Sequence, residues 1–259
     1  MATQLDYEND VNYIDHGDYD DYDEYDDAMT DFHSTALHDA VLSGNASGVH
    51  TVLDGGFDIH TRDGQGRDAL QLASGIKGAS NIVQLLLSRG ANVNAKPLVH
   101  SSSRTEVVGS GEMDDLQLLL EHCGIDDLPD FGFGPENPLL SAAAVGESEI
   151  VRLLIQYGAD VNIKGGMYGN PLEAAAHYGD KSTVLILLNA GADVNASGGY
   201  HGNALQAAAR YGRLELVQIL LDKGADVNAQ GGVYTNALTS ARERGHVEVE
   251  QLLVSKGAS

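Results

Sequence analysis

Apolar and polar positions follow a pattern that recurs every 33 or 34 residues along most of the chain. In the unit that ends at Gly224, small apolar residues fill positions 204–209, Gly212 interrupts them, and a second apolar stripe follows at 214–222. The first run has high helix propensity, and the second run has the spacing of one buried helix face. Each unit is therefore predicted to form two short helices followed by a turn.

A glycine ends the second predicted helix of every unit. Seven such glycines stand 34, 34, 34, 33, 33 and 33 residues apart: Gly56, Gly90, Gly124, Gly158, Gly191, Gly224 and Gly257. A period of this size indicates stacked repeats, in which each unit buries its apolar face against its neighbours. The 259 residues therefore predict one elongated array, whose long side surface is typically used to hold another protein.

A polar residue precedes the first predicted helix of each unit. Its side-chain oxygen can accept a hydrogen bond from an amide of the first turn. The corresponding positions all hold good capping residues: Thr35, Asp68, Ser103, Asn137, Asn170, Asn203 and Asn236. This register supports a unit made of helix, helix and turn.

These residues resemble the ankyrin repeat. The segments 153–162, 187–195 and 220–228 carry its paired leucines and its Gly-Ala-Asp-Val-Asn close. The match covers about 34–259 and implies an all-α ankyrin-repeat solenoid of about seven helix-turn-helix units with short β-turn fingers. It also implies that Asn94, Asn162, Asn195 and Asn228 hydrogen-bond the loops of adjacent repeats. The variant at 165–176 resembles arrays found in large fungal proteins.

One unit departs from the pattern, around residues 95–127. Ser101–Arg104 replace the usual turn there, and Cys-Gly-Ile-Asp-Asp replaces the usual close. One interpretation is a bend or a flexible joint in the array. The other is neutral sequence variation on an exposed loop. At the end of the chain, Arg242 and Glu250 stand where Val184 and similar residues face the next repeat, so we expect an exposed C-terminal cap and a finished array.

The acidic charge is concentrated near the N-terminus. Residues 1–31 hold twelve Asp and Glu and no Lys or Arg, in a chain whose net charge is -23. Residues 1–33 are therefore expected to form an acidic, tyrosine-rich disordered tail. Such charge repels nucleic acid and anionic membranes, so we expect no nucleic acid and no membrane as partner, and it favours a protein with a basic patch.

The sequence lacks the usual patterns of catalysis. Cys123 is the only cysteine, so it forms no internal disulfide, and no phosphate-binding loop or His-Glu-x-x-His motif occurs. The N-terminus has no secretory signal, and no stretch is apolar enough to span a membrane. We expect a non-catalytic, monomeric protein without cofactor or metal, intracellular in the cytoplasm or nucleus, and not secreted.

The resemblance places binding on a concave face formed by turn tips and the first helices. The tips carry Tyr168, Tyr200, His201 and Tyr234, and the helix positions carry His177, Tyr178, Arg210, Tyr211, Glu243 and Arg244. Tyrosine and arginine dominate binding hot spots because they combine large contact area with a polar end. The alternative interpretation is that the tyrosines pack one turn against the next.

Two functions remain open from the sequence. The first is an adaptor or scaffold that holds another protein on its concave face, mainly over residues 165–244. The second is a transcriptional co-regulator, in which the acidic and aromatic tail is an activation-type segment. A third interpretation is that the tail only keeps the array soluble or folds back over Arg210 and Arg244.

Overall fold

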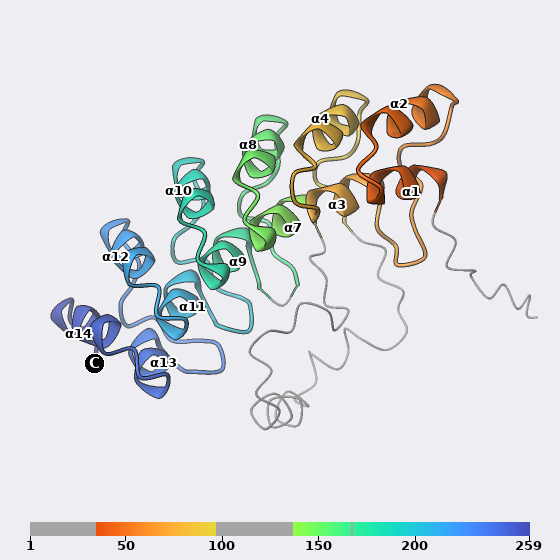
Figure 1. Ribbon diagram of the computed structural model, residues 1–259. Coiled ribbons are helices and arrows are strands. Elements are labelled where there is room, and N and C mark those ends of the chain that lie inside the picture. The colour runs from red at the N-terminus through yellow and green to blue at the C-terminus, as the bar shows by residue number, and fades with distance from the viewer. Residues whose placement is uncertain (1–34, 97–136, 167) are drawn as a thin grey trace, which may run out of the picture. The chain divides into compact units, whose positions relative to one another are not determined.

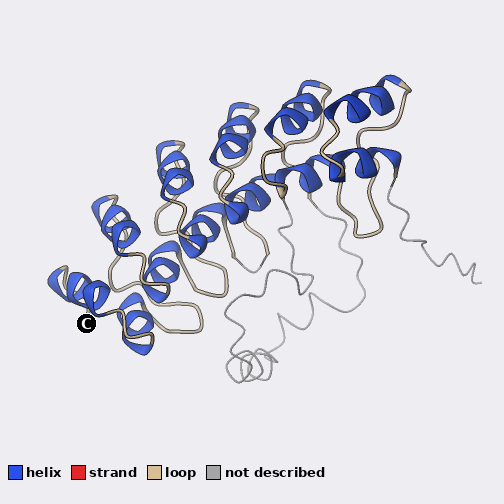
Figure 2. Cartoon of the chain, in the orientation of Figure 1, coloured by secondary structure: helices blue, strands red, loops and turns tan. Residues whose placement is uncertain are grey.

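The computed structural model describes residues 35–96 and 137–259, except Met167. Within these ranges the chain forms twelve α-helices and no strand, as the sequence predicts. The helices come in consecutive pairs, shown in Figures 1 and 2: α1 (Ala36–Leu42) and α2 (Ala46–Asp54), α3 (Ala69–Ser74) and α4 (Ser80–Ser88), α7 (Pro138–Val145) and α8 (Ser148–Gln156), α9 (Pro171–Tyr178) and α10 (Lys181–Asn189), α11 (Ala204–Arg210) and α12 (Leu214–Asp222), α13 (Ala237–Glu243) and α14 (Val247–Ser255).

The first helix of each described pair begins at the predicted capping residue. In all six, the side chain of the cap accepts a hydrogen bond from a backbone amide of the first turn. Asp68 and Gln71 also form a reciprocal capping box. The six predicted caps in the described ranges are therefore confirmed, while Ser103 lies outside the described residues.

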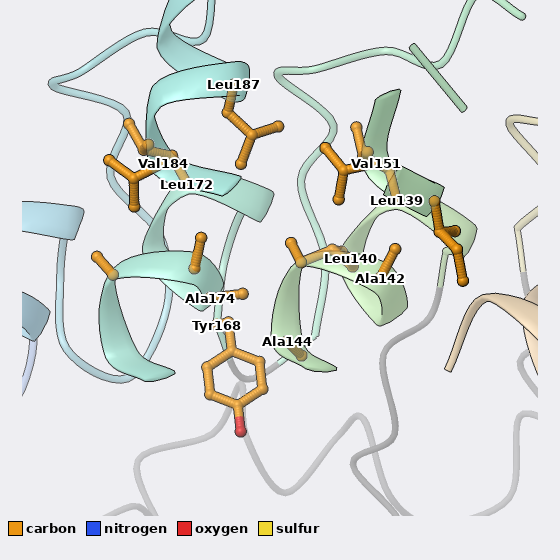
Figure 3. Close-up of a cluster of buried hydrophobic side chains, with 14 of the residues drawn as sticks. Leu139, Leu140, Ala142, Ala144, Val151, Tyr168, Leu172, Ala174, Val184 and Leu187 are labelled. Carbon is orange, nitrogen blue, oxygen red and sulfur yellow. The ribbon is translucent and has the colours of Figure 1, made fainter. Parts of the chain in front are cut away.

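The helices form two layers. The first helices of the pairs pack side by side in one layer, and the second helices pack in the other (Figure 1). Alanines such as Ala174, Ala175 and Ala176 are fully buried between neighbouring first helices. Their small side chains let the helices approach closely, while leucines such as Leu172 and Leu187 fill the space between the layers (Figure 3).

The last described pair has the polar outer face that the sequence predicts. Val184 and Val217 are fully buried between repeats. In contrast, the Arg242 and Glu250 side chains are 55% and 34% exposed, and they form an ion pair with 2.7 Å between Nε and Oε1. The charges are therefore solvated and paired at the outer face of α13–α14.

A ladder of asparagines joins consecutive repeats, as the resemblance implies. The Asn162 amide donates to the Gly191 carbonyl at 3.2 Å, and its oxygen accepts from the Asp193 amide at 2.8 Å. Asn195 and Asn228 make the same pair of bonds to the following repeats. Each asparagine thus satisfies one carbonyl and one amide of the next loop.

The same ladder shows that α3–α4 stack directly on α7–α8. Asn94 donates to the Gly158 carbonyl at 3.1 Å, and it accepts from the Asp160 amide at 2.9 Å. In agreement, α3 packs against α7 and α4 packs against α8. The α7–α8 pair is therefore the next repeat of the stack after α3–α4. Apart from Ala95 and Lys96, the unit expected around 95–127, with Cys123, lies outside the described residues, as does the tail.

Replacing Asn94 with alanine tests this direct stacking. Because both bonds to the next repeat would be lost, we expect Asn94→Ala to lower the free energy of unfolding by about 1–2 kcal/mol. Asn162→Ala is the matched control and should cost a similar amount, as measured by urea denaturation. A cost at Asn162 with none at Asn94 would contradict the contact between α3–α4 and α7–α8.

Short fingers connect the pairs and lie close to one another. In the finger 197–203, the Gly198 amide donates to the Gly202 carbonyl at 3.1 Å, and Ser197 and Asn203 form an isolated β-bridge. The Val233 amide of the next finger donates to the Tyr200 carbonyl at 3.1 Å. The fingers are therefore joined through their backbones, which fixes the tip side chains relative to each other.

Candidate protein-binding surface

The predicted binding residues of three consecutive repeats come together at the ends of α9 and α11. His177 and Tyr178 form the last turn of α9, while Arg210 and Tyr211 occupy the same register positions at the end of α11. The fingers add the remaining members. We call this set the aromatic surface: Tyr168, His177, Tyr178, Tyr200, His201, Arg210, Tyr211 and Tyr234.

His177 lies at the centre of the aromatic surface. Its ring centroid is 4.6 Å from that of Tyr178 and 4.4 Å from that of Tyr211, both in edge-on geometry. The rings of Tyr168 and His201 lie 5.1 Å and 5.0 Å away. These separations are in the range where aromatic rings stabilise each other beyond their buried area. Contacts between aromatic rings therefore connect consecutive repeats at this point.

Two hydrogen bonds fix the orientation of the central rings. The hydroxyl oxygens of Tyr168 and Tyr178 are 2.6 Å apart. Nδ1 of His177 and Nε2 of His201 are 2.9 Å apart, so one nitrogen donates and the other accepts. In Figure 3 the hydroxyl of Tyr168 is directed away from the apolar cluster. The ring orientations are thus set within the protein.

The members of the aromatic surface differ in exposure. Tyr168, His201, Arg210 and Tyr234 are buried, between 2% and 8% exposed. Tyr178 is 42% exposed. His177, Tyr200 and Tyr211 are half-buried. The buried tip tyrosines pack one turn against the next, which is the alternative interpretation of these residues. Tyr178 and Tyr211 leave part of their surface accessible to the solvent.

Arg210 is covered by the next finger. Its guanidinium carbon lies 3.7 Å from the centroid of the Tyr234 ring, a cation–π geometry. At the end of α13, the register counterparts Glu243 and Arg244 are exposed. Glu243 and Arg244 are therefore accessible to the solvent, whereas Arg210 is not.

Burial favours the uncharged forms of His201, Tyr168 and Tyr200 in the aromatic surface. It lowers the pKa of His201 to about 3, and the positive charges of His177 and Arg210 act in the same direction. Burial also raises the pKa of Tyr168, and the hydrogen bond to Tyr178 adds to this. The surface can therefore bind by stacking and by neutral hydrogen bonds.

The acidic excess lies mostly outside the described residues. These residues hold 14 Lys and Arg against 17 Asp and Glu, so their formal charge is -3 of the total -23. Within the same ranges, no group of three or more His, Cys, Asp or Glu could hold a metal ion. No helix in the described segments is long and apolar enough to cross a membrane.

The register of the first helices extends the surface beyond the predicted residues. The positions that correspond to Tyr178 and Tyr211 in the earlier repeats hold Ser43, Ile76 and Val145, and Leu42 corresponds to His177. Leu42 is 56% exposed, and Ile76 and Val145 are partly exposed. From α3 to α13, the register of Tyr178 therefore changes from the aliphatic Ile76 and Val145 through the two tyrosines to the charged Arg244. Alignment on the capping residue would have found these positions.

A model of the family described as "Ankyrin repeats (3 copies)" matches residues 4–97, 106–198 and 197–259. The chain belongs to the ankyrin-repeat family. Ankyrin repeats generally mediate protein–protein interaction, and their fold is typically non-catalytic. The finer resemblance to fungal arrays stays a prediction.

Two known proteins illustrate the similarity. The chain is 30% identical over 148 residues to the mouse (Mus musculus) B-cell lymphoma 3 protein homolog, a match that covers 53% of this chain and 31% of that protein. The human ASB11 ankyrin repeat domain superposes with a TM-score of 0.66 at 23% identity, covering 87% of this chain and 85% of the other. The structural likeness supports the fold alone.

Proposed function

We propose that this ankyrin array is an adaptor or scaffold that holds another protein on the face that carries the aromatic surface. The observation that carries this proposal is that Tyr178 is exposed and Tyr211 is half-buried on a base of packed rings. Exposed tyrosines on a rigid support lose little conformational entropy when a partner binds, which is the property of hot-spot residues.

The buried neighbours support the same proposal. The hydroxyl of Tyr178 is held by Tyr168, and the ring of Tyr211 is packed on His177. Such pre-organisation lowers the free-energy cost of ordering side chains on binding. Arg244 and Glu243 at one end and Leu42 at the other would add a charged and an apolar contact to an extended partner.

Comparative capture tests the proposal. We expect Tyr178→Ala to weaken capture of the physiological partner at least tenfold, because a hot-spot tyrosine contributes more than about 1.4 kcal/mol. Tyr157→Ala is the matched control, since Tyr157 is 45% exposed but caps the C-terminus of α8 in the other layer. Both variants are checked by circular dichroism, and captured proteins are quantified by mass spectrometry. Equal capture by both variants would refute binding at Tyr178.

The co-regulator alternative depends on residues 1–33, which lie outside the described residues. Deleting them would abolish reporter activation under this alternative and leave partner capture intact under the adaptor proposal. The basic patch on the partner, the monomeric state and the intracellular location also stay predictions.

A further inference from the structure

In two repeats, the third residue of the first helix connects its repeat to the next finger, whereas in α7 this residue is the apolar Leu140. Nε2 of Gln206 donates to the carbonyls of Gly231 and Thr235 at 2.7 and 3.1 Å. In the first repeat, Nε2 of His38 lies 3.0 Å from the Arg67 carbonyl. Where this register position holds a polar side chain, as at His38 and Gln206, it supplies a hydrogen-bond donor to backbone carbonyls of the following finger.

Glu173 occupies this position in α9, where a carboxylate would have no proton to donate. Its side chain is fully buried. Oε1 accepts a hydrogen bond from the His201 amide at 3.2 Å, and Oε2 has no partner among the described residues. Burial raises the pKa of Glu173 to about 9, although the His201 amide acts in the opposite direction.

We propose that Glu173 is a neutral carboxylic acid at neutral pH and that its proton fastens the finger 197–203 to α9. The register of Gln206 identifies the acceptors as the carbonyls of Gly198 or Gly202, which correspond to those of Gly231 and Thr235. Loss of the proton leaves a buried anion facing backbone carbonyls, a costly arrangement that opening of the finger relieves.

The neighbouring ionisable groups do not neutralise such an anion. The first helix packed on one side, α7, has no ionisable side chain. On the other side, α11 carries Arg210, which lies over Tyr234. At the start of α10, Lys181 pairs with Glu215. Within α9 and the finger, the titratable groups are His177, Tyr178, Tyr200 and the buried, neutral His201.

The consequence is a proton-sensitive finger within the binding face. The finger 197–203 carries Tyr200 and His201 of the aromatic surface, and its Tyr200 carbonyl accepts from Val233 of the next finger. Release of this finger would therefore disturb the contacts of three repeats. This inference concerns the folded array itself and does not depend on any partner.

Urea denaturation between pH 6.5 and 9 tests the proposal on the full chain. The native state keeps a proton that the unfolded state loses above pH 4.5, so raising the pH favours unfolding until about pH 9. We expect the unfolding equilibrium constant of the wild type to rise about tenfold per pH unit relative to Glu173→Gln. The amide of glutamine supplies the donor at every pH.

The reciprocal variant and an exchange measurement complete the test. Gln206→Glu should introduce the same dependence on pH one repeat further along. At pH 8.5, amide hydrogen exchange of residues 198–202 should be faster in the wild type than in Glu173→Gln. If the wild type and Glu173→Gln have parallel pH profiles and equal exchange in the finger, Glu173 carries no such proton and the proposal is overturned, whether or not Gln206→Glu folds.

Discussion

Gly232→Ala is expected to destabilise the array by about 3–4 kcal/mol, the sum of a backbone clash and left-handed strain. Gly232 has φ of 62°, and a Cβ atom there would lie 2.3 Å from both the carbonyl carbon and the oxygen of His201. These are backbone atoms of the neighbouring finger, so they cannot move aside without breaking the contact between fingers.

Gly245→Ala separates the two contributions. Gly245 has φ of 70°, close to that of Gly232, but a Cβ atom there meets nothing within 4 Å. We expect this control to cost only the strain, about 1–2 kcal/mol. Chemical denaturation of both variants gives the comparison. Equal costs at the two positions would show that the fingers are not in close contact at Gly232.

Glu173→Gln is expected to make the array lose stability as the pH falls from 6.5 to 4.5, by about 1.4 kcal/mol per pH unit. The reason is His201, whose pKa in the folded array is lowered to about 3, so the unfolded state binds a proton that the native state does not. In the wild type, Glu173 is protonated in the native state and ionised in the unfolded state over the same pH range, because its pKa is raised from 4.5 to about 9 on folding. Through Glu173, lowering the pH therefore stabilises the native state. The contributions of His201 and Glu173 have opposite signs and cancel. These two groups therefore leave the free energy of unfolding of the wild type independent of pH between 6.5 and 4.5.

Thermal and urea unfolding of the variants at pH 4.5, 5.5 and 6.5 check this expectation. Other carboxyl groups, such as Asp63 with its lowered pKa, contribute equally to each protein and drop out of the differences. In the double variant that carries His201→Gln and Glu173→Gln, both contributions are absent. Its free energy of unfolding should follow the same dependence on pH as that of the wild type. A Glu173→Gln profile parallel to that of the wild type would mean that the two groups do not oppose each other as described.

Local rules explain which parts of the fold could be predicted. Capping at Asn170 depends on neighbours at fixed sequence distance, so the register predicted it, whereas the asparagine ladder followed from the resemblance to ankyrin repeats. Direct stacking of α3 on α7 could not be predicted, because Gly124 preserves the spacing of the glycines whether or not a repeat stands there. Periodicity reports the spacing of residues and does not report which repeats touch.

The chemistry of the candidate surface was predictable in kind, but its exposure was not. Arg210 and Arg244 both stand at the end of a first helix. However, Arg210 is buried under Tyr234 of the next finger, while Arg244 is exposed. A glutamate such as Glu173 is normally expected on the surface. Only the comparison with Gln206, which holds the same position in the next repeat, shows that it faces a finger. These differences depend on contacts between repeats, which a single unit does not contain.

Photo-crosslinking tests the central claim most directly, namely that the aromatic surface binds another protein. Tyr178 and, separately, Tyr157 are replaced by p-benzoylphenylalanine, and the proteins crosslinked in cells that express the chain are identified by mass spectrometry. The adaptor proposal predicts a specific protein crosslinked from position 178 and absent from position 157. Crosslinking of the same partner from position 157 alone would place binding on the other layer and contradict the proposal.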